Sequence, residues 1–81
     1  MIVRGNTVTL PGSGTGMQLD FLAASEVSKN RITGARDGLT MYSTSGQTLV
    51  ANNFIQADYN PLFVRSPAGV RVLHVGDAVA T

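Results

Sequence analysis

Residues 27–32 read Val27-Ser28-Lys29-Asn30-Arg31-Ile32, a pattern that recurs along the chain. It consists of a branched apolar residue, two variable residues, an asparagine, one variable residue and then valine or isoleucine. The same pattern occurs at residues 3–8 (VRGNTV) and 50–55 (VANNFI), so that successive copies begin 24 and 23 residues apart. Repeats of this length are typical of solenoids, in which each repeat forms one turn of a stack.

One further step of 23 residues predicts a fourth, incomplete copy at residues 73–78, with Gly76 in place of the asparagine. Beyond each asparagine, apolar residues alternate with other residues, as in a half-buried strand. The first copy needs two extra residues to stay in phase, and the chain breakers at 10–16 predict a loop that absorbs them. The alternating apolar pairs are Met17 and Leu19, Leu39 and Met41, and Leu62 and Val64.

A coil of this length, at roughly 3.3 Å per extended residue, has a perimeter of roughly 75 Å, which suits three short strands joined by three bends. The sequence therefore predicts an all-β parallel solenoid of about three coils, formed by residues 1–81 as a single module. The expected coils are 3–26, 27–49 and 50–72, with a partial last coil at 73–78. Equivalent residues should stack in inward columns: Val3, Val27, Val50 and Leu73; Val8, Ile32, Ile55 and Ala78; Met17, Leu39 and Leu62.

The repeated asparagines Asn6, Asn30 and Asn53 are expected to form a ladder at a bend of the coil. Stacked amides satisfy one another as donor and acceptor, which makes buried polar groups acceptable. Ordinary turn residues or glycosylation acceptors are the alternatives, but Asn6 and Asn53 lack a serine or threonine two positions on. Their regular spacing favours the ladder.

Two other interpretations compete for parts of the chain. A leucine-rich repeat has a similar length but needs several leucines per repeat, and this chain has few. The segment 20–29 contains helix-forming residues, so a short helix is the second choice there after a strand and a corner.

Composition indicates a small β-protein that is not specialised for nucleic acid or membranes. Charged residues make up 14% of the chain, the net charge is +1, and the six basic residues form no stripe that would attract nucleic acid. No apolar run approaches the roughly 18 residues that a membrane span needs, and no signal peptide is recognised. The chain has no cysteine, so the sequence predicts neither disulfides nor a thiolate metal site.

The small size predicts that the chain is part of something larger. A stack of about three coils leaves unpaired strand edges and exposed core at both ends, and a chain this short buries only about 60% of its unfolded surface. We expect either a fragment of a longer solenoid or a subunit of a homotrimer. Outward aromatic residues that could form the contact are Phe21, Tyr42, Phe54 and Phe63.

The repeated V-x-x-N-x-I, together with the stretch from Asn30 to Met41, resembles the right-handed parallel β-helix repeat of the pectin-lyase-like superfamily. That superfamily includes polysaccharide lyases, hydrolases, alginate epimerases and bacteriophage tailspikes. The resemblance covers nearly the whole chain and implies fold more strongly than activity, because the repeat belongs to the scaffold. It implies recognition of a bacterial polysaccharide at a virion or extracellular surface. We expect neither a cofactor nor a metal.

Catalysis and binding make different demands on the residues. Cleavage of a glycan by hydrolysis needs two carboxylates about 5 to 10 Å apart, and the least unlikely pair is Asp37 and Asp58 on neighbouring coils, although both also fit turns. The single histidine, His74, is expected at the surface or a corner. Glycan binding needs aromatic and polar side chains on a flat strand face, and the candidates are Arg36, Asp37, Tyr42, Tyr59 and Arg65.

The sequence thus favours a non-catalytic module of a tailspike-like protein that binds glycans and forms trimers. A fragment of a polysaccharide lyase, hydrolase or epimerase, and a purely structural trimerising or capping segment, are the alternatives.

Overall fold

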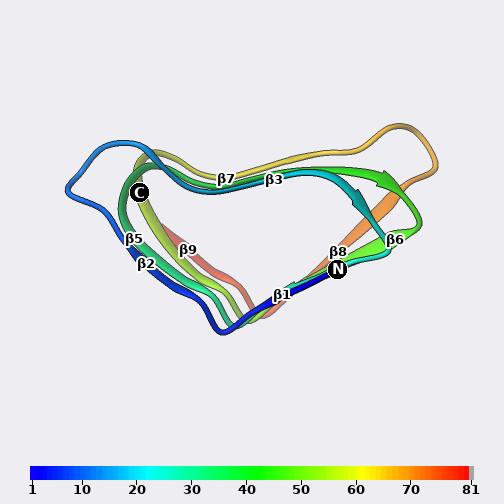
Figure 1. Ribbon diagram of the computed structural model, residues 1–81, viewed down its shortest axis with the longest axis horizontal. Helices are drawn as coiled ribbons and strands as arrows, with labels where there is room; N and C mark the ends of the chain where they lie inside the picture. Colours follow the sequence, from blue (N-terminus) through cyan, green and yellow to red (C-terminus); the bar gives the residue numbers. More distant parts are fainter. Residues whose placement is uncertain (81) are drawn as a thin grey trace.

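The computed structural model describes residues 1–80, and the chain there winds into stacked coils with three sides (Figure 1). The strands in this range are β1 (Ile2–Arg4), β2 (Thr7–Thr9), β3 (Thr15–Ala23), β4 (Glu26–Ser28), β5 (Arg31–Ser45), β6 (Gln47–Ala51), β7 (Phe54–Arg65), β8 (Arg71–Val75) and β9 (Ala78–Ala80). Strands β5 and β7 each bend around a corner, so that one continuous strand contributes to two sides of its coil.

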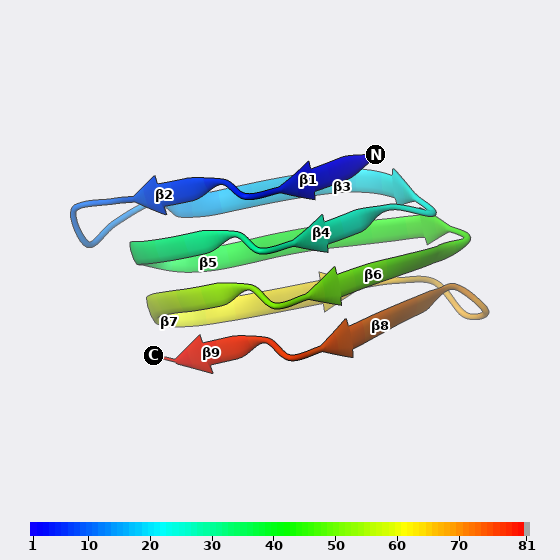
Figure 2. The same ribbon diagram turned by 90° about the horizontal axis from the view of Figure 1, so that it is seen from below.

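Equivalent strands of successive coils pair in parallel, as the side view shows (Figure 2). One sheet has the order β1-β4-β6-β8 and the other has the order β2-β5-β7-β9, with β3 pairing the second half of β5. The predicted fold class, a parallel β-solenoid of about three turns, is confirmed. The segment 20–29 contains the end of β3, a bend and β4, so the alternative of a helix there is wrong.

The register in the first three coils follows the repeat. Val27 lies opposite Val3 and Val50, and Ile32 lies opposite Val8 and Ile55. Val8 pairs with Ile32 and Thr15 pairs with Asp37. The first coil is thus two residues longer than the second between these two pairs, so its two extra residues lie in the loop between β2 and β3.

The fourth coil lies one residue further along the chain than the repeat predicts. Val50 pairs with His74 and Ile55 pairs with Val79, so the placement of Leu73 and Ala78 in the inward columns is wrong. Paired residues are still 23 positions apart at Tyr42 and Arg65, but they are 24 positions apart at Gln47 and Arg71. The extra residue therefore lies in the turn at 66–70. That turn absorbs the insertion because none of its residues belongs to a strand.

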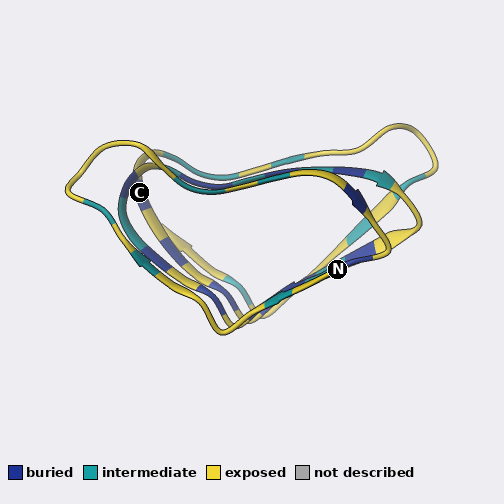
Figure 3. Ribbon diagram, in the orientation of Figure 1, coloured by how far each residue is buried: buried dark blue, intermediate teal, exposed yellow. Residues whose placement is uncertain are grey.

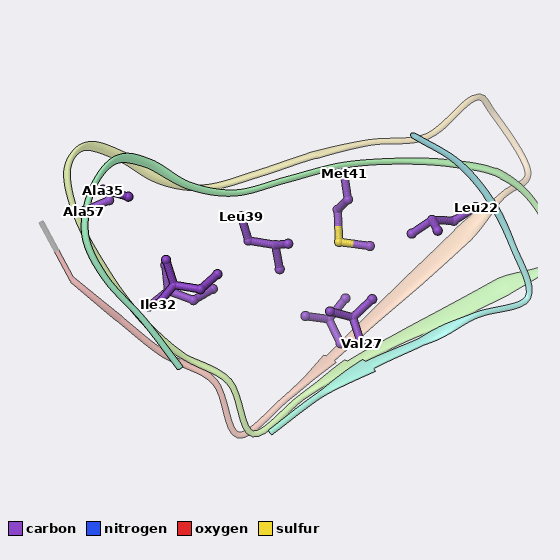
Figure 4. Packing of buried hydrophobic residues seen from close by; sticks show 9 residues of the cluster. Leu22, Val27, Ile32, Ala35, Leu39, Met41 and Ala57 are labelled. Atoms are coloured by element: carbon purple, nitrogen blue, oxygen red, sulfur yellow. The ribbon is translucent and has the colours of Figure 1, made fainter. Parts of the chain in front are cut away.

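The core runs down the middle of the stack, and its buried residues come from the second and third coils and from Leu22 of the first (Figure 3). In Figure 4 the side chains of Val27, Ile32, Leu39 and Met41 point into the space that the coil encloses. Val3 and Val8, which continue these columns in the first coil, are only partly buried, as is Val72 in the last coil. The ends of the stack are therefore less well packed than its middle.

Two glycines let β5 turn the corner between its two sides. Gly34 has a φ of 73°, which glycine adopts without the steric cost that a side chain would add. A Cβ at Gly38 would overlap the carbonyl oxygen of Pro61 and Cγ2 of Ile55 in the next coil. Close stacking at this corner thus requires the absence of a side chain.

Candidate functional site

The longest side of the solenoid, formed by β3, the second half of β5 and β7, has an outer face rich in aromatic and polar side chains. Leu39 and Met41 are buried, so the alternation along β5 directs Thr40 and Tyr42 outward. Thr40 pairs in register with Gln18 on β3 and Phe63 on β7. We call this surface the outer face of β3–β5–β7.

Four of the five residues predicted to bind glycans form two arginine–tyrosine pairs, each linking β5 to β7. Cζ of Arg65 lies 5.4 Å from the ring centroid of Tyr42, and Cζ of Arg36 lies 5.0 Å from that of Tyr59. A guanidinium over an aromatic ring at such distances is attracted by the ring's quadrupole. Tyr59 remains 70% exposed, so most of its ring is available to a ligand.

The two pairs lie at different points along the same strand. Arg36 and Tyr42 are six residues apart on β5, which at roughly 3.3 Å per residue places them within about 20 Å of each other. The outer face and its corner therefore offer two separate contact points to an extended ligand.

Asp37, the fifth predicted residue, lies at the corner between these points. It is half-buried, pairs in register with Thr15 and Asn60, and its backbone N–H donates to the carbonyl oxygen of Gly14 at 3.2 Å. This backbone contact joins β5 to the loop of the first coil, so Asp37 has a clear role in the corner.

Phe21 also lies on this face, although the sequence predicted only an oligomer contact for it. Its ring centroid lies 5.8 Å from that of Tyr42, with the two planes tilted by 47°, and the residue is 74% exposed. The backbone of Phe21 has a φ of 58°, a region that bulky residues rarely adopt. The strand register shows a bulge at this position. Leu19 pairs with Met41 and Leu22 pairs with Ser43, so β3 has one residue more than β5 between these two pairs.

The two catalytic candidates are not joined by a cleft. Asp58 is exposed, and a Cβ on Gly12 would lie 4.0 Å from its Oδ2, so Asp58 borders the loop between β2 and β3. Asp37 belongs to the corner described above. No pocket is found among residues 1–80.

The repeated asparagines form a row of hydrogen bonds at the sharp bend where β1 meets β2, β4 meets β5 and β6 meets β7 (Figure 1). The backbone N–H and Nδ2 of Asn6 donate to Oδ1 of Asn30 at 3.1 and 3.0 Å. The same groups of Asn30 donate to Oδ1 of Asn53 at 3.1 and 2.9 Å. Nδ2 of Asn30 and of Asn53 also donates to the carbonyl oxygens of Val3 and Val27, both at 3.0 Å.

Asp77 occupies the fourth position of this row, which the sequence analysis assigned to Gly76. Its Oδ1 accepts from the backbone N–H of Asn53 at 2.9 Å and from Nδ2 of Asn53 at 3.0 Å. Its Oδ2 lies 3.4 Å from Nδ1 of His74. His74 is an exposed residue of the last coil and lies in register with the buried Val50. Its side-chain partner is the carboxylate of Asp77.

Two further findings bear on cofactors and membranes. Within residues 1–80, no three histidine, cysteine, aspartate or glutamate side chains come together as metal ligands. In the same range, no helix is long and apolar enough to cross a membrane.

Comparison of the chain with protein-family models, with curated proteins and with solved structures finds no match. What identifies the chain is its architecture, a parallel β-solenoid of about three turns with an asparagine row at one corner.

Proposed function

We propose that the chain is a non-catalytic glycan-binding module of a tailspike-like, polysaccharide-recognising protein with a right-handed β-helix of the pectin-lyase-like type. The observation that supports this most is the presence of two arginine–tyrosine pairs that link β5 to β7, Arg65 with Tyr42 on the outer face and Arg36 with Tyr59 beside its corner. Such a protein acts at a virion or extracellular surface, where bacterial polysaccharides are accessible.

The chemistry of the pairs suits a sugar chain. A tyrosine ring covers the apolar face of a pyranose, while its hydroxyl and the neighbouring guanidinium bond the sugar's hydroxyl groups. A face without a pocket suits a polymer that passes across the protein, because such a ligand does not have to end inside it.

Replacing Tyr42 or Tyr59 by alanine should weaken binding to the recognised polysaccharide by about tenfold each, since a stacked aromatic contact contributes on the order of 1 kcal/mol or more. The measurement is a screen of purified bacterial capsular and lipopolysaccharide glycans, followed by calorimetric titration of those that bind. Phe54→Ala is the matched control, because Phe54 also carries an arginine, Arg31 at 4.4 Å, but lies outside this face.

Two results of this experiment would reject the proposal. Unchanged affinity in both tyrosine variants would remove the outer face of β3–β5–β7 from binding. Release of oligosaccharide products by the wild-type chain would favour the alternative, a fragment of a lyase, hydrolase or epimerase, with Asp37 and Asp58 as the first residues to replace.

We further propose that the chain forms a homotrimer through the outer face of β1–β4–β6–β8. Leu49, Leu73 and Val75 alternate with inward-facing residues and therefore point outward on this face. Leu73 is 43% exposed and Val75 is 49% exposed. Nearer β1 the same face is polar: Arg4 and Glu26 form a salt bridge of 2.8 Å, and hydrogen bonds from Arg4 and Ser28 lower the pKa of Glu26. An exposed apolar patch bordered by charges is typical of a protein contact.

Sedimentation at low micromolar concentration should give a mass near three chains, and Leu73→Asp should shift it toward one chain. Phe63→Ser is the control, because Phe63 is also an exposed apolar residue but lies on β7, in the other sheet. A cooperatively folded wild-type monomer would exclude the trimer, and a shift caused by Phe63→Ser alone would move the contact to the aromatic residues. A trimer that binds no glycan would leave the purely structural alternative.

A further inference from the structure

The backbone at Phe21 is strained in a way that its packing does not repay. Phe21 is a bulky residue with a φ of 58° and is 74% exposed, so its ring gains little from burial. Strained positions of this kind are costly and cluster at sites where ligands bind. Glycine would adopt the same backbone conformation without that cost.

The strain has a structural effect, which is to hold the ring outward. The extra residue in β3 forms a bulge between Leu19 and Leu22, and both of these leucines pack on the core side. Bulges redirect side chains and occur often beside functional sites. Here the bulge places the Phe21 ring next to Tyr42, whose ring in turn is covered by Arg65.

Phe21, Tyr42 and Arg65 therefore form a column that crosses three coils, from β3 through β5 to β7. Two strand spacings of about 4.8 Å make this column roughly 10 Å long. The remaining charged side chain near its β3 end is Asp20, whose Oδ2 accepts from Nε2 of Gln18 at 3.2 Å. At the β7 end Arg65 forms no salt bridge with any residue of the described range.

We propose that this column is a saccharide subsite in which a neutral sugar ring stacks on Phe21 and a neighbouring acidic sugar places its carboxylate on Arg65. This inference rests on the proposed glycan-binding function and assigns the ligand its chemistry and direction. The Asp20 and Gln18 side chains bond hydroxyl groups and repel an acid at the β3 end. A guanidinium is the side chain best suited to a planar carboxylate, which it binds through two parallel hydrogen bonds. The ligand thus runs across the strands and not along them.

Phe21→Gly separates binding from folding. Because glycine relieves the strain and removes only an exposed ring, the variant should unfold at a temperature equal to or above that of the wild type. It should nevertheless bind the recognised polysaccharide at least tenfold more weakly. Ala24→Gly is the matched control: Ala24 has a φ of 44° and is exposed, so glycine relieves strain there too, but no aromatic ring is lost.

Arg65→Gln tests the acidic end. The probe is a uronic-acid-containing capsular polysaccharide that the wild type binds, used before and after chemical reduction of its carboxyl groups. Reduction should weaken wild-type binding at least tenfold and should leave the affinity of Arg65→Gln nearly unchanged.

The outcomes distinguish the two levels of the proposal. If the wild type binds no polysaccharide, the proposed function fails as a whole. If binding depends on Tyr42 and Tyr59 but Phe21→Gly binds as the wild type does, or if carboxyl reduction has no effect, the function stands and the subsite is wrong. A lower unfolding temperature for Phe21→Gly would show that Phe21 serves stability, which also overturns the subsite.

Discussion

Replacing Ile32 or Val50 by alanine should lower the free energy of unfolding by about 2 to 4 kcal/mol. Both residues are fully buried and belong to the second and third coils, so they have a coil on either side. Neighbouring side chains in such a position are fixed by strand pairing and cannot collapse into the space that the lost methyl groups leave. Equilibrium unfolding in denaturant, with the slope checked for constancy, measures the change.

Val3→Ala is the matched control for Val50→Ala, because Val3 belongs to the same column but lies in the first coil and is only partly buried. Its effect should be clearly smaller. An equal effect at both positions would show that the first coil is covered, as it would be in a tight assembly or in a longer continuous solenoid.

Asn30→Ala should lower the free energy of unfolding by about 1 to 3 kcal/mol or more, since several buried groups lose a partner together. The side chain of Asn30 accepts two hydrogen bonds from Asn6 and donates to Asn53 and to the carbonyl oxygen of Val3. An alanine side chain makes none of these hydrogen bonds. Asn53 is only 1% exposed, so water cannot easily reach the groups that lose their partner. Denaturant unfolding again gives the magnitude.

Asn6→Ala provides the comparison, because Asn6 is exposed and has no coil before it in the described structure. Water can satisfy the groups that it leaves, so its effect should be smaller than that of Asn30→Ala. If the two variants were equally stable, the row of amides would contribute nothing beyond ordinary turn hydrogen bonds.

The columns of the first three coils could be predicted because the period of the sequence maps directly onto strand pairing. Val3, Val27 and Val50 are equivalent in sequence and in space, since each coil returns the chain to the same point. The prediction was wrong in the fourth coil because β8 is apolar on both faces. With Val72, Leu73 and Val75 all available, the apolar pattern does not reveal a shift of one residue.

The outer face was less predictable for a physical reason. The sequence identifies Arg36, Tyr42, Tyr59 and Arg65 as separate candidates, but which arginine covers which tyrosine depends on register and on the corner between Ala57 and Asn60. Phe21 was predicted to face outward, but it was missed as a binding residue because its contact with Tyr42 depends on a local bulge in β3 that the repeat does not reveal.

The hydrogen bonds of the asparagine row give the stack a direction. Every bond between the side chains of the row runs toward the later coil, from Asn6 to Asn30 to Asn53 and then to Asp77, although Nδ2 of Asn30 and of Asn53 also donates to a carbonyl oxygen of the earlier coil. An ionised carboxylate only accepts, so this relay of dipoles stops at Asp77. A coil laid beyond it, whether from another molecule or from further chain, receives no side-chain donor and meets a negative charge instead. The solenoid therefore does not template its own unlimited growth at this corner, which is how an open β-edge avoids becoming the seed of a fibre.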